Sequence, residues 1–369
     1  MFSEAQLRRR ALAAHAPSFD AAQLALVAVA NPDLAALEEA DAAALAALGL
    51  TTRAARWFAA PDRARIDADL RWLESARGTL LAVTDPEYPA LLRLTADAPP
   101  VLWVRGDPAA LAEPQLAMVG SRNPTAGGRA SAREFAAWFA RAGLTITSGL
   151  ALGIDAASHE GALDGGGLTI AVLGCGLDVT YPAQHAALLE RIAGSGAVTS
   201  EFPPGTAALK AHFPQRNRII AGLAAGTLVV EAAQRSGSLI TARLAGIAGR
   251  EVFALPSSIH NERARGCHEL IRQGAKLVER PEDVLAELKI SLTDQLLEKP
   301  GTKPEKVRVL DKAYKILLDA LAFEPASVDS LIERTGMNSE SIASMLLVLE
   351  LDGHVAPHPG GRYSRMAGK

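Results

Sequence analysis

The sequence predicts an α/β protein in which a large sheet domain lies between two small, mainly helical domains. Three observations support this class. Hydrophobic residues make up 49% of the 369 residues and charged residues 21%, which provides enough apolar material for a packed core. Short apolar runs alternate with helical patterns between residues 79 and 290, as in a parallel sheet covered by helices. Helical patterns dominate residues 1–78 and 307–369.

Residues 1–78 are rich in alanine, leucine and arginine and predict a small domain of short helices. Polar breaks at residues 31–33, 49–52 and 61–62 separate the helices. The segment Ala43–Arg53 fits half of a helix-hairpin or sterile-alpha-motif-like module, a type that often contacts the DNA backbone. Nine arginines stand against ten acidic residues, so packing or protein contact is the favoured interpretation and DNA contact the alternative.

Nine apolar runs predict the strands of the central sheet over residues 79–290. Several are apolar throughout, as strands buried on both faces should be. Glycines follow many of their carboxyl ends, where open α/β sheets bind ligands, so this domain is predicted to be an extended Rossmann-like domain. The predicted strands are Thr79–Val83, Leu102–Val104, Leu116–Val119, Leu144–Thr147, Leu168–Leu173, Ala197–Ser200, Thr227–Glu231, Glu251–Leu255 and Ala275–Val278.

Residues 291–306, which contain Pro300-Gly301 and Pro304, predict a linker. Three helices and a short ribbon follow over residues 307–369, which is the order of a winged-helix-like domain. From Lys303 onward nine basic residues balance nine acidic ones, whereas a DNA-reading wing usually carries a basic excess. Protein contact is therefore favoured over DNA contact. The predicted elements are Val307–Ala322, Ser327–Thr335, Ser339–Asp352 and the ribbon from Gly353 to Tyr363.

Two glycine-containing loops follow predicted strands and are candidates for phosphate binding. The first, Val119–Gly128, contains Gly120, Ser121 and Arg122, whose amides and guanidinium could surround a phosphate. The second runs through Gly237 and Ser238 into a helix, where capping residues leave amides free. Either loop alone is equally well explained as a tight connection or a helix cap. Grouped with a third loop on one sheet edge, they favour a phosphate site.

The third loop leads into the segment Lys210–Gly222. Pro214 suits the first helical position, which puts Arg216 and Arg218 in the opening turns. Cations there oppose the helix dipole by roughly 0.3–1 kcal/mol each, a penalty that a bound anion would reverse.

Lys210 and Phe213 lie just upstream and provide a point charge and an aromatic face, a pairing used to hold a single-stranded backbone and stack a base. Residues 201–250 carry six basic and two acidic side chains in a chain of net charge −3. A nucleic-acid site must therefore be a local patch. The alternative is a solvated basic helix end.

These segments, in this order and spacing, closely resemble the DNA-processing protein A (DprA) family over roughly Ala117 to Leu277. The resemblance implies a cytoplasmic, homodimeric single-stranded-DNA-binding protein of natural transformation that protects incoming DNA and loads the RecA recombinase onto it. It rests on Val119–Arg122, Ser148–Asp155, Ala171–Asp178 with Tyr181-Pro182, Ser200-Glu201, Phe213–Leu223 and Ser236–Leu239.

The same resemblance carries DNA-binding roles over to ten residues of this sequence. Helical N-terminal and winged-helix C-terminal domains also fit the family. The ten residues are Gly120, Ser121, Arg122, Lys210, Phe213, Arg216, Asn217, Arg218, Gly237 and Ser238.

An enzyme is the alternative, because Rossmann-like phosphoribohydrolases act on nucleotides. Their Pro-Gly-Gly-x-Gly-Thr loop is missing from this sequence, as are the Walker loop, the G-x-G-x-x-G fingerprint and the G-x-S-x-G elbow. Asp155 and His159, at i and i+4, could form an acid/base pair, although such a pair more often braces a helix. A binding protein rather than an enzyme, without a cofactor, is predicted.

Metal, disulfide and membrane chemistry are also disfavoured. Cys175, Cys267, His260 and His268 show no zinc spacing, and two cysteines cannot build a disulfide scaffold. The apolar stretch Ile219–Val230 is too short to cross a bilayer, and the N-terminus lacks the apolar run of a signal peptide. A soluble, cytoplasmic protein without a membrane partner is expected.

Overall fold

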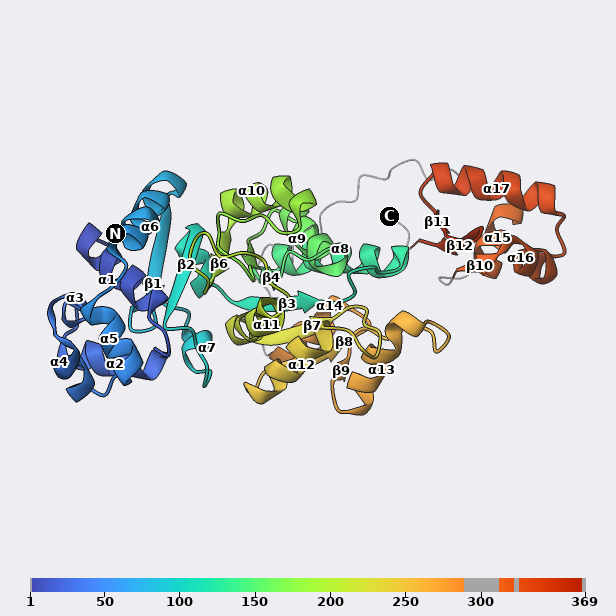
Figure 1. The fold of residues 1–369 in the computed structure, drawn as a ribbon. Coiled ribbons are helices and arrows are strands. Elements are labelled where there is room, and N and C mark those ends of the chain that lie inside the picture. Colours follow the sequence, from blue (N-terminus) through green and yellow to red (C-terminus); the bar gives the residue numbers. More distant parts are fainter. Residues whose placement is uncertain (1, 289–311, 322–324, 367–369) are drawn as a thin grey trace.

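The computed structural model describes residues 2–288, 312–321 and 325–366. Figure 1 shows the N-terminal helices at one end, the sheet in the middle and the C-terminal helices and ribbon at the other end. The predicted linker, residues 291–306, lies outside the described residues.

The central sheet has nine strands in the order β1-β2-β6-β5-β4-β3-β7-β8-β9. Strands β3 to β9 run parallel, as predicted, whereas β1 and β2 form an antiparallel edge because the chain reverses between them without a crossover over the sheet. All nine predicted strands are present, with ends that differ by at most two residues. Their bounds are β1 Gly78–Ala82, β2 Val101–Gly106, β3 Gln115–Val119, β4 Thr145–Ser148, β5 Thr169–Val172, β6 Ala197–Ser200, β7 Gly226–Val229, β8 Glu251–Ala254 and β9 Lys276–Leu277.

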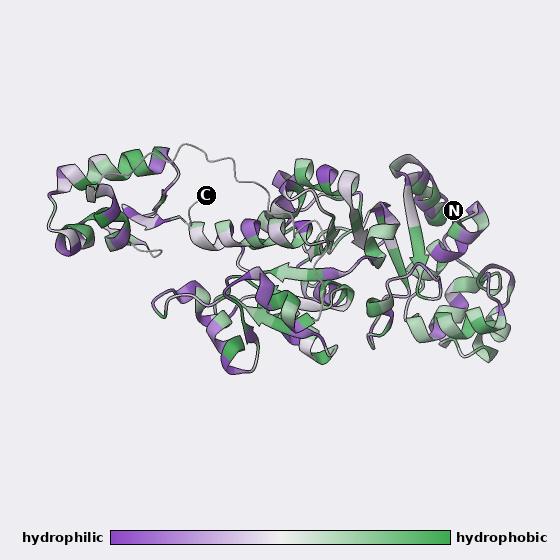
Figure 2. Ribbon diagram, turned by 180° about the vertical axis from the view of Figure 1, so that it is seen from behind, coloured by the Kyte–Doolittle hydropathy of each residue, from purple (hydrophilic) through white to green (hydrophobic). Residues whose placement is uncertain are grey.

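Helices cover both faces of the sheet because alternate strand residues point to opposite sides. Leu116 and Met118 of β3 pack into one core with α8 and α14, whereas Ala117 and Val119 belong to the other core with α11 and α12. Figure 2 shows hydrophobic strands between helices of mixed polarity. The helices of this part are α7 Ala90–Arg93, α8 Ala126–Arg141, α9 Ile154–Asp164, α10 Ala186–Ser195, α11 His212–Leu223, α12 Ser238–Ile247, α13 Arg265–Arg272 and α14 Pro281–Leu288, with one-turn helices at Pro108–Ala112, Ala183–His185 and Glu262–Ala264.

Six helices form the N-terminal part and share one hydrophobic core with β1 and β2. The guanidinium of Arg10 joins them to the sheet region through a buried two-point ion pair with Asp85, with Nε–Oδ2 and Nη2–Oδ1 distances of 2.9 and 2.5 Å. The helices are α1 Glu4–His15, α2 Ala21–Ala30, α3 Ala36–Glu39, α4 Ala42–Ala47, α5 Thr52–Ala59 and α6 Arg63–Ala76.

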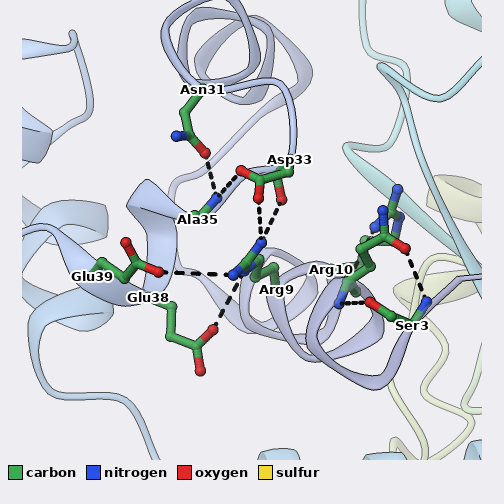
Figure 3. Close-up of polar contacts among 9 residues, drawn as sticks. Ser3, Arg9, Arg10, Asn31, Asp33, Ala35, Glu38 and Glu39 are labelled. Atoms are coloured by element: carbon green, nitrogen blue, oxygen red, sulfur yellow. Dashed lines mark hydrogen bonds and ion pairs between the residues drawn. The ribbon is translucent and has the colours of Figure 1, made fainter.

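The three consecutive arginines of α1 are neutralised within the protein. Arg9 reaches from α1 to Asp33 at 2.9 Å and to Glu38 at 3.4 Å, as Figure 3 shows. Arg8 pairs with Asp67 at 2.7 Å, and Arg10 pairs with Asp85. These side chains therefore hold helices together rather than present free charge to a ligand.

The C-terminal part has the order and sheet of a winged helix, as predicted. Helices α15, α16 and α17 pack around a small core, and a three-stranded sheet in the order β10-β12-β11 forms the ribbon. No helix among the described residues is long and apolar enough to span a membrane. The elements are α15 Lys312–Leu321, β10 Ala326–Ser327, α16 Val328–Thr335, α17 Ser339–Leu351, β11 Val355–His358 and β12 Arg362–Arg365.

Candidate functional site

The candidate site lies at the carboxyl edge of the parallel strands, where the strand order reverses. Strand β3 pairs with β4 on one side and with β7 on the other, so the chain turns in opposite directions from this point. Open α/β sheets bind ligands in the crevice at such a switch point. The loops that follow β3, β4, β5 and β7 meet here.

Arg122, Phe213 and Tyr181 form a group of one cation and two aromatic rings at this edge. The Cζ atom of Arg122 lies 5.6 Å from the centroid of the Phe213 ring. The ring centroids of Tyr181 and Phe213 are 5.3 Å apart, and Tyr181 is 47% exposed. Arg122 is exposed and, within the described residues, forms no ion pair with a carboxylate. The group can thus offer a positive charge and an aromatic surface to the same ligand.

Arg216 lies beneath this group and is buried, with 3% of its surface exposed. Its Nη1 donates to the carbonyl oxygen of Val172 at 2.7 Å, while its Nε is buried without a hydrogen-bond partner in the described structure. Burial lowers the pKa of Arg216 to about 10, the charge of Asp155 opposes this shift, and the like charge of Arg122 adds to it. An anion near Arg122 and Arg216 would relieve the repulsion between these two cations.

Asp155 and His159 bind different partners rather than each other. The Asp155 carboxylate accepts from the amides of Gly149 and Ala151 at 3.2 and 3.3 Å, and burial raises its pKa despite the opposing charge of Arg216. Nδ1 of His159 lies 2.6 Å from Oγ1 of Thr169. Both side chains are buried, which matches the bracing role that the sequence favoured for this pair.

Helix α11 begins at His212, two residues before the predicted start at Pro214. Proline is tolerated as the third residue because the first amides of a helix have no intrahelical partner. Nδ1 of His212 lies 3.2 Å from the carbonyl oxygen of Gly174, and the His212 ring stacks on Phe202 with centroids 4.2 Å apart. These contacts fix the start of α11 against the loops after β5 and β6.

Lys210 and Arg218 differ in exposure and in ion pairing with carboxylates. Lys210 is exposed in the turn before α11 and forms no ion pair within the described chain. Arg218 pairs with Glu201 at 2.6 Å and with Asp97 at 3.5 Å, and its side chain is 16% exposed. The sequence predicts an available cation at Arg218, but the structure gives it two carboxylate partners. Asn217, which precedes Arg218 on α11, is half-buried.

The loop after β3 is organised by a carboxylate of the protein itself. Glu231 accepts from the amide and the hydroxyl of Thr125, at 3.0 and 2.6 Å, and so occupies the start of α8. The amide of Ser121 donates to the carbonyl oxygen of Glu231 at 2.7 Å. A Cβ on Gly120 would lie 2.7 Å from Ile154, so this glycine allows close packing. Of the amides predicted to surround a phosphate, that of Ser121 is therefore engaged, and the Arg122 side chain forms no ion pair within the described residues.

The loop before α12 is more open. Gly237 precedes the helix, and a Cβ there would meet nothing within 4 Å. The hydroxyls of Ser236 and Ser238 lie 2.7 Å apart, and Ser238 is buried. The Gly237 amide donates to no acceptor in the described structure, so it is available to a ligand.

Three residues of the site were not among the predicted binding residues. Tyr181 could have been found as an aromatic residue before Pro182, in the segment that follows the predicted strand Leu168–Leu173. The capping role of Glu231 and the close approach of Gly149 to Arg216 depend on contacts between segments far apart in the sequence, and no local pattern indicates them. No group of three or more His, Cys, Asp or Glu side chains in the described ranges is arranged to hold a metal ion.

Two family models match this sequence. The model described as DNA recombination-mediator protein A matches residues 79–289. The model described as DprA winged helix domain matches residues 301–361.

Curated relatives extend the similarity over most of the chain. Protein Smf of Escherichia coli (strain K12) is 44% identical over 324 residues, which cover 87% of this chain and 86% of the relative. The DNA processing protein DprA of Streptococcus pneumoniae is 48% identical over 206 residues, which cover 56% of this chain and 73% of the relative.

Two solved structures have a similar fold. The X-ray structure of DNA processing protein A from Streptococcus pneumoniae matches with a TM-score of 0.66 and 37% identity, over 78% of this chain and 99% of that chain. The DNA processing protein A of Helicobacter pylori, solved to explain its single-stranded DNA binding mode, matches with a TM-score of 0.53 and 28% identity, over 59% of this chain and 98% of that chain.

Proposed function

Since the chain belongs to the DNA recombination-mediator protein A (DprA) family, we propose that it binds single-stranded DNA as a non-enzymatic mediator of recombination. In this proposal it works in the cytoplasm during natural transformation, protects incoming DNA and loads the RecA recombinase onto it. The structural neighbour from Helicobacter pylori, described for its single-stranded DNA binding mode, supports the choice of ligand.

The observation that carries the proposal is that Arg122, which forms no ion pair within the described residues, lies over the Phe213 ring at the switch point of the sheet. A phosphate next to Arg122 would gain a charge-assisted hydrogen bond without displacing a carboxylate. Phe213 and Tyr181 would stack bases, which any base permits because each has a π-face. Recognition should therefore tolerate any sequence and should disfavour duplex DNA, whose base faces are covered.

The other predicted binding residues receive graded roles. Lys210 and the Gly237 amide have no partner in the part of the chain that the structure describes, so both can contact phosphates directly. Arg216 is buried and contributes its positive charge to the electrostatic potential of the site. Its hydrogen bond to the carbonyl oxygen of Val172 also fixes the end of β5. Arg218 and Asn217 position α11, with Arg218 anchored to Glu201. Gly120 and Ser121 shape the loop after β3, and Ser238 shapes the loop between β7 and α12.

A homodimer would place two such sites on one DNA strand and increase affinity through avidity. This partner and RecA are proposed from the family resemblance alone. Helix α17 of the winged-helix part carries exposed Leu347 and Leu351. Its sequence, Ser339–Leu351, contains no Lys or Arg. This composition supports protein contact rather than DNA contact for the C-terminal part.

The test is a comparison of purified protein with mixed-sequence single-stranded and double-stranded oligonucleotides of equal length by fluorescence anisotropy. We expect tighter binding of the single strand and a steep loss of affinity with salt, because Arg and Lys contacts act through counterion release. Incubation with nucleotides should release no base, sugar or phosphate. Turnover that scales with protein concentration and disappears in Asp155→Ala would support the phosphoribohydrolase-like alternative.

A further inference from the structure

Two further cations lie at the same edge of the sheet, on the far side of Arg122, and a third lies at the other end of α13. Arg235 follows β7, Arg265 begins α13 and Arg272 ends it, and all three side chains are exposed. Arg235 and Arg272 form no ion pair in the part of the chain that the structure describes. Arg265 has a 3.6 Å contact with Glu262, which is itself 81% exposed. An exposed pair of this kind contributes little, so it leaves Arg265 open to another anion.

The strand order arranges these cations in a line. Strands β3, β7 and β8 are neighbours in the sheet, and parallel strands end at the same edge. The loops that carry Arg122, Arg235 and Arg265 follow these strands in that order. Arg235 and Arg265 therefore continue the site at Arg122.

A close backbone contact locks α13 to the loop after β7. The amide of Gly266 donates to the carbonyl oxygen of Ala232 at 2.8 Å. A Cβ on Gly266 would lie 2.7 Å from that oxygen and 2.8 Å from the carbonyl oxygen of Ala233, so only glycine permits this approach. The contact holds the adjacent Arg265 beside the loop that leads to Gly237.

Two of these cations, Arg265 and Arg272, border a surface pocket of about 340 Å³. Arg265, Arg272, His268, Gln234 and Ile259 line it. Nε2 of His268 lies 2.8 Å from the carbonyl oxygen of Ser257, which fixes the ring, and Ile259 is 77% exposed. Two guanidinium groups and an amide beside an apolar side chain suit a phosphate with its attached sugar.

We propose that Arg235, Arg265 and Arg272 bind the phosphodiester backbone of the same single strand, next to the segment held at Arg122 and Phe213. This inference rests on the proposed function. Phe213 packs on Gly174 beyond β5, and four strand intervals separate β5 from β8. At about 4.8 Å per interval the track is about 19 Å long, which fits about five nucleotides of a stacked strand. A tetranucleotide is thus too short to fill both segments.

The experiment compares binding of oligothymidylates of four and twenty nucleotides by fluorescence anisotropy across a salt series. The variant is Arg265→Ala/Arg272→Ala in the full chain, with Arg141→Ala as control. Arg141 ends α8 as Arg272 ends α13, is exposed and forms no ion pair in the described ranges, but it does not line the pocket that Arg265 and Arg272 share. Equal melting temperatures establish that the variants are folded.

We expect the double variant to bind the long oligonucleotide about 25-fold more weakly at 0.1 M salt, about fivefold for each lost phosphate contact. The slope of log affinity against log salt should fall by about 1.4 for the long oligonucleotide. Binding of the tetranucleotide, and both affinities of Arg141→Ala, should stay unchanged.

If the double variant binds the long oligonucleotide with the same affinity and salt slope as the unmodified protein, the inference is overturned and the proposed function stands. An equal loss for both lengths would also overturn it, because the effect would then lie at the Arg122 site. Absence of binding by the unmodified protein would instead refute the proposed function and the inference with it.

Discussion

The guanidinium of Arg216 lies against the backbone of Gly149, so closely that a Cβ on residue 149 would stand 1.7 Å from Nη1. The same Nη1 donates to the carbonyl oxygen of Val172. Two loops of the sheet edge are therefore joined by a buried cation that only glycine can accommodate. The surface that holds Phe213 and Arg122 depends on this contact.

Substitution of Gly149 by alanine should destabilise the protein. The added methyl group would displace Arg216 from Val172, and overpacking of this kind reduces the free energy of unfolding by about 1–3 kcal/mol. Gly246 in α12 is the control, because a Cβ there meets nothing within 4 Å. Gly246→Ala should increase stability by about 0.4–1 kcal/mol. Urea denaturation measures both, and equal effects of the two variants would contradict the packing argument.

Lys210→Ala should weaken single-stranded DNA binding and leave the melting temperature unchanged. Lys210 is exposed and unpaired in the described structure, so its loss removes one phosphate contact and no internal one. The slope of log affinity against log salt should fall by about 0.7. Lys210→Arg retains the charge and should retain the slope. An unchanged slope in Lys210→Ala would exclude this residue from the site.

Phe213→Ala should reduce the binding free energy by about 1–3 kcal/mol and leave the salt slope nearly unchanged, because a stacked base carries no counterions of its own. Phe213→Leu separates stacking from packing, since leucine keeps apolar volume but lacks a π-face. Both variants should lose affinity if the ring stacks a base. If leucine restores binding, or if only the melting temperature falls, the ring serves the core instead.

Acid should destabilise the fold through His159. Burial lowers the pKa of His159 to about 3, with smaller contributions from the charges of His185 and Arg216. An unfolded histidine titrates near 6.5, so between these values the unfolded chain binds a proton that the folded chain excludes. Stability is thus complete above about pH 6.5 and falls by about 1.4 kcal/mol per pH unit below it.

The measurement compares urea denaturation of the unmodified protein and His159→Gln at pH 7.5 and pH 5. The difference in stability between the two proteins should change by about 2 kcal/mol in favour of the variant at the lower pH. Other titratable groups act in both proteins and cancel in the difference. A pH-independent difference would show that folding does not lower the pKa of His159.

Much of the fold could be predicted because it is encoded locally. The nine strands are short apolar runs bounded by polar or glycine-containing segments, and each was found within two residues of its ends. The winged helix was recognisable from its helix order. The antiparallel pairing of β1 and β2 was not, because pairing direction depends on the path of the chain between strands rather than on either strand.

For the site, the residue types were predictable but their exposure was not in every case. Arg216 was predicted as a DNA-binding cation, yet Ile219, Ile220 and Leu223 follow it at i+3, i+4 and i+7, so the helix spacing alone could have placed it on the buried face of α11. Arg218 offered no such signal. Its partners Glu201 and Asp97 come from other segments, and nothing in the helix itself indicates that its charge is neutralised.

The sequence by itself determined the strands, the helix faces, the glycine-containing turns and the set of basic and aromatic side chains near them. Each of these depends on the periodicity and conformational preferences of neighbouring residues. Only the tertiary structure decided that Arg122 and Lys210 form no ion pair within the described residues, whereas Arg218 is paired with Glu201 and Asp97. It also placed Glu231 at the start of α8, 106 residues from its partner Thr125. The reason is that charge neutralisation and close packing arise between segments distant in sequence, once the strand order has brought β3 and β7 together.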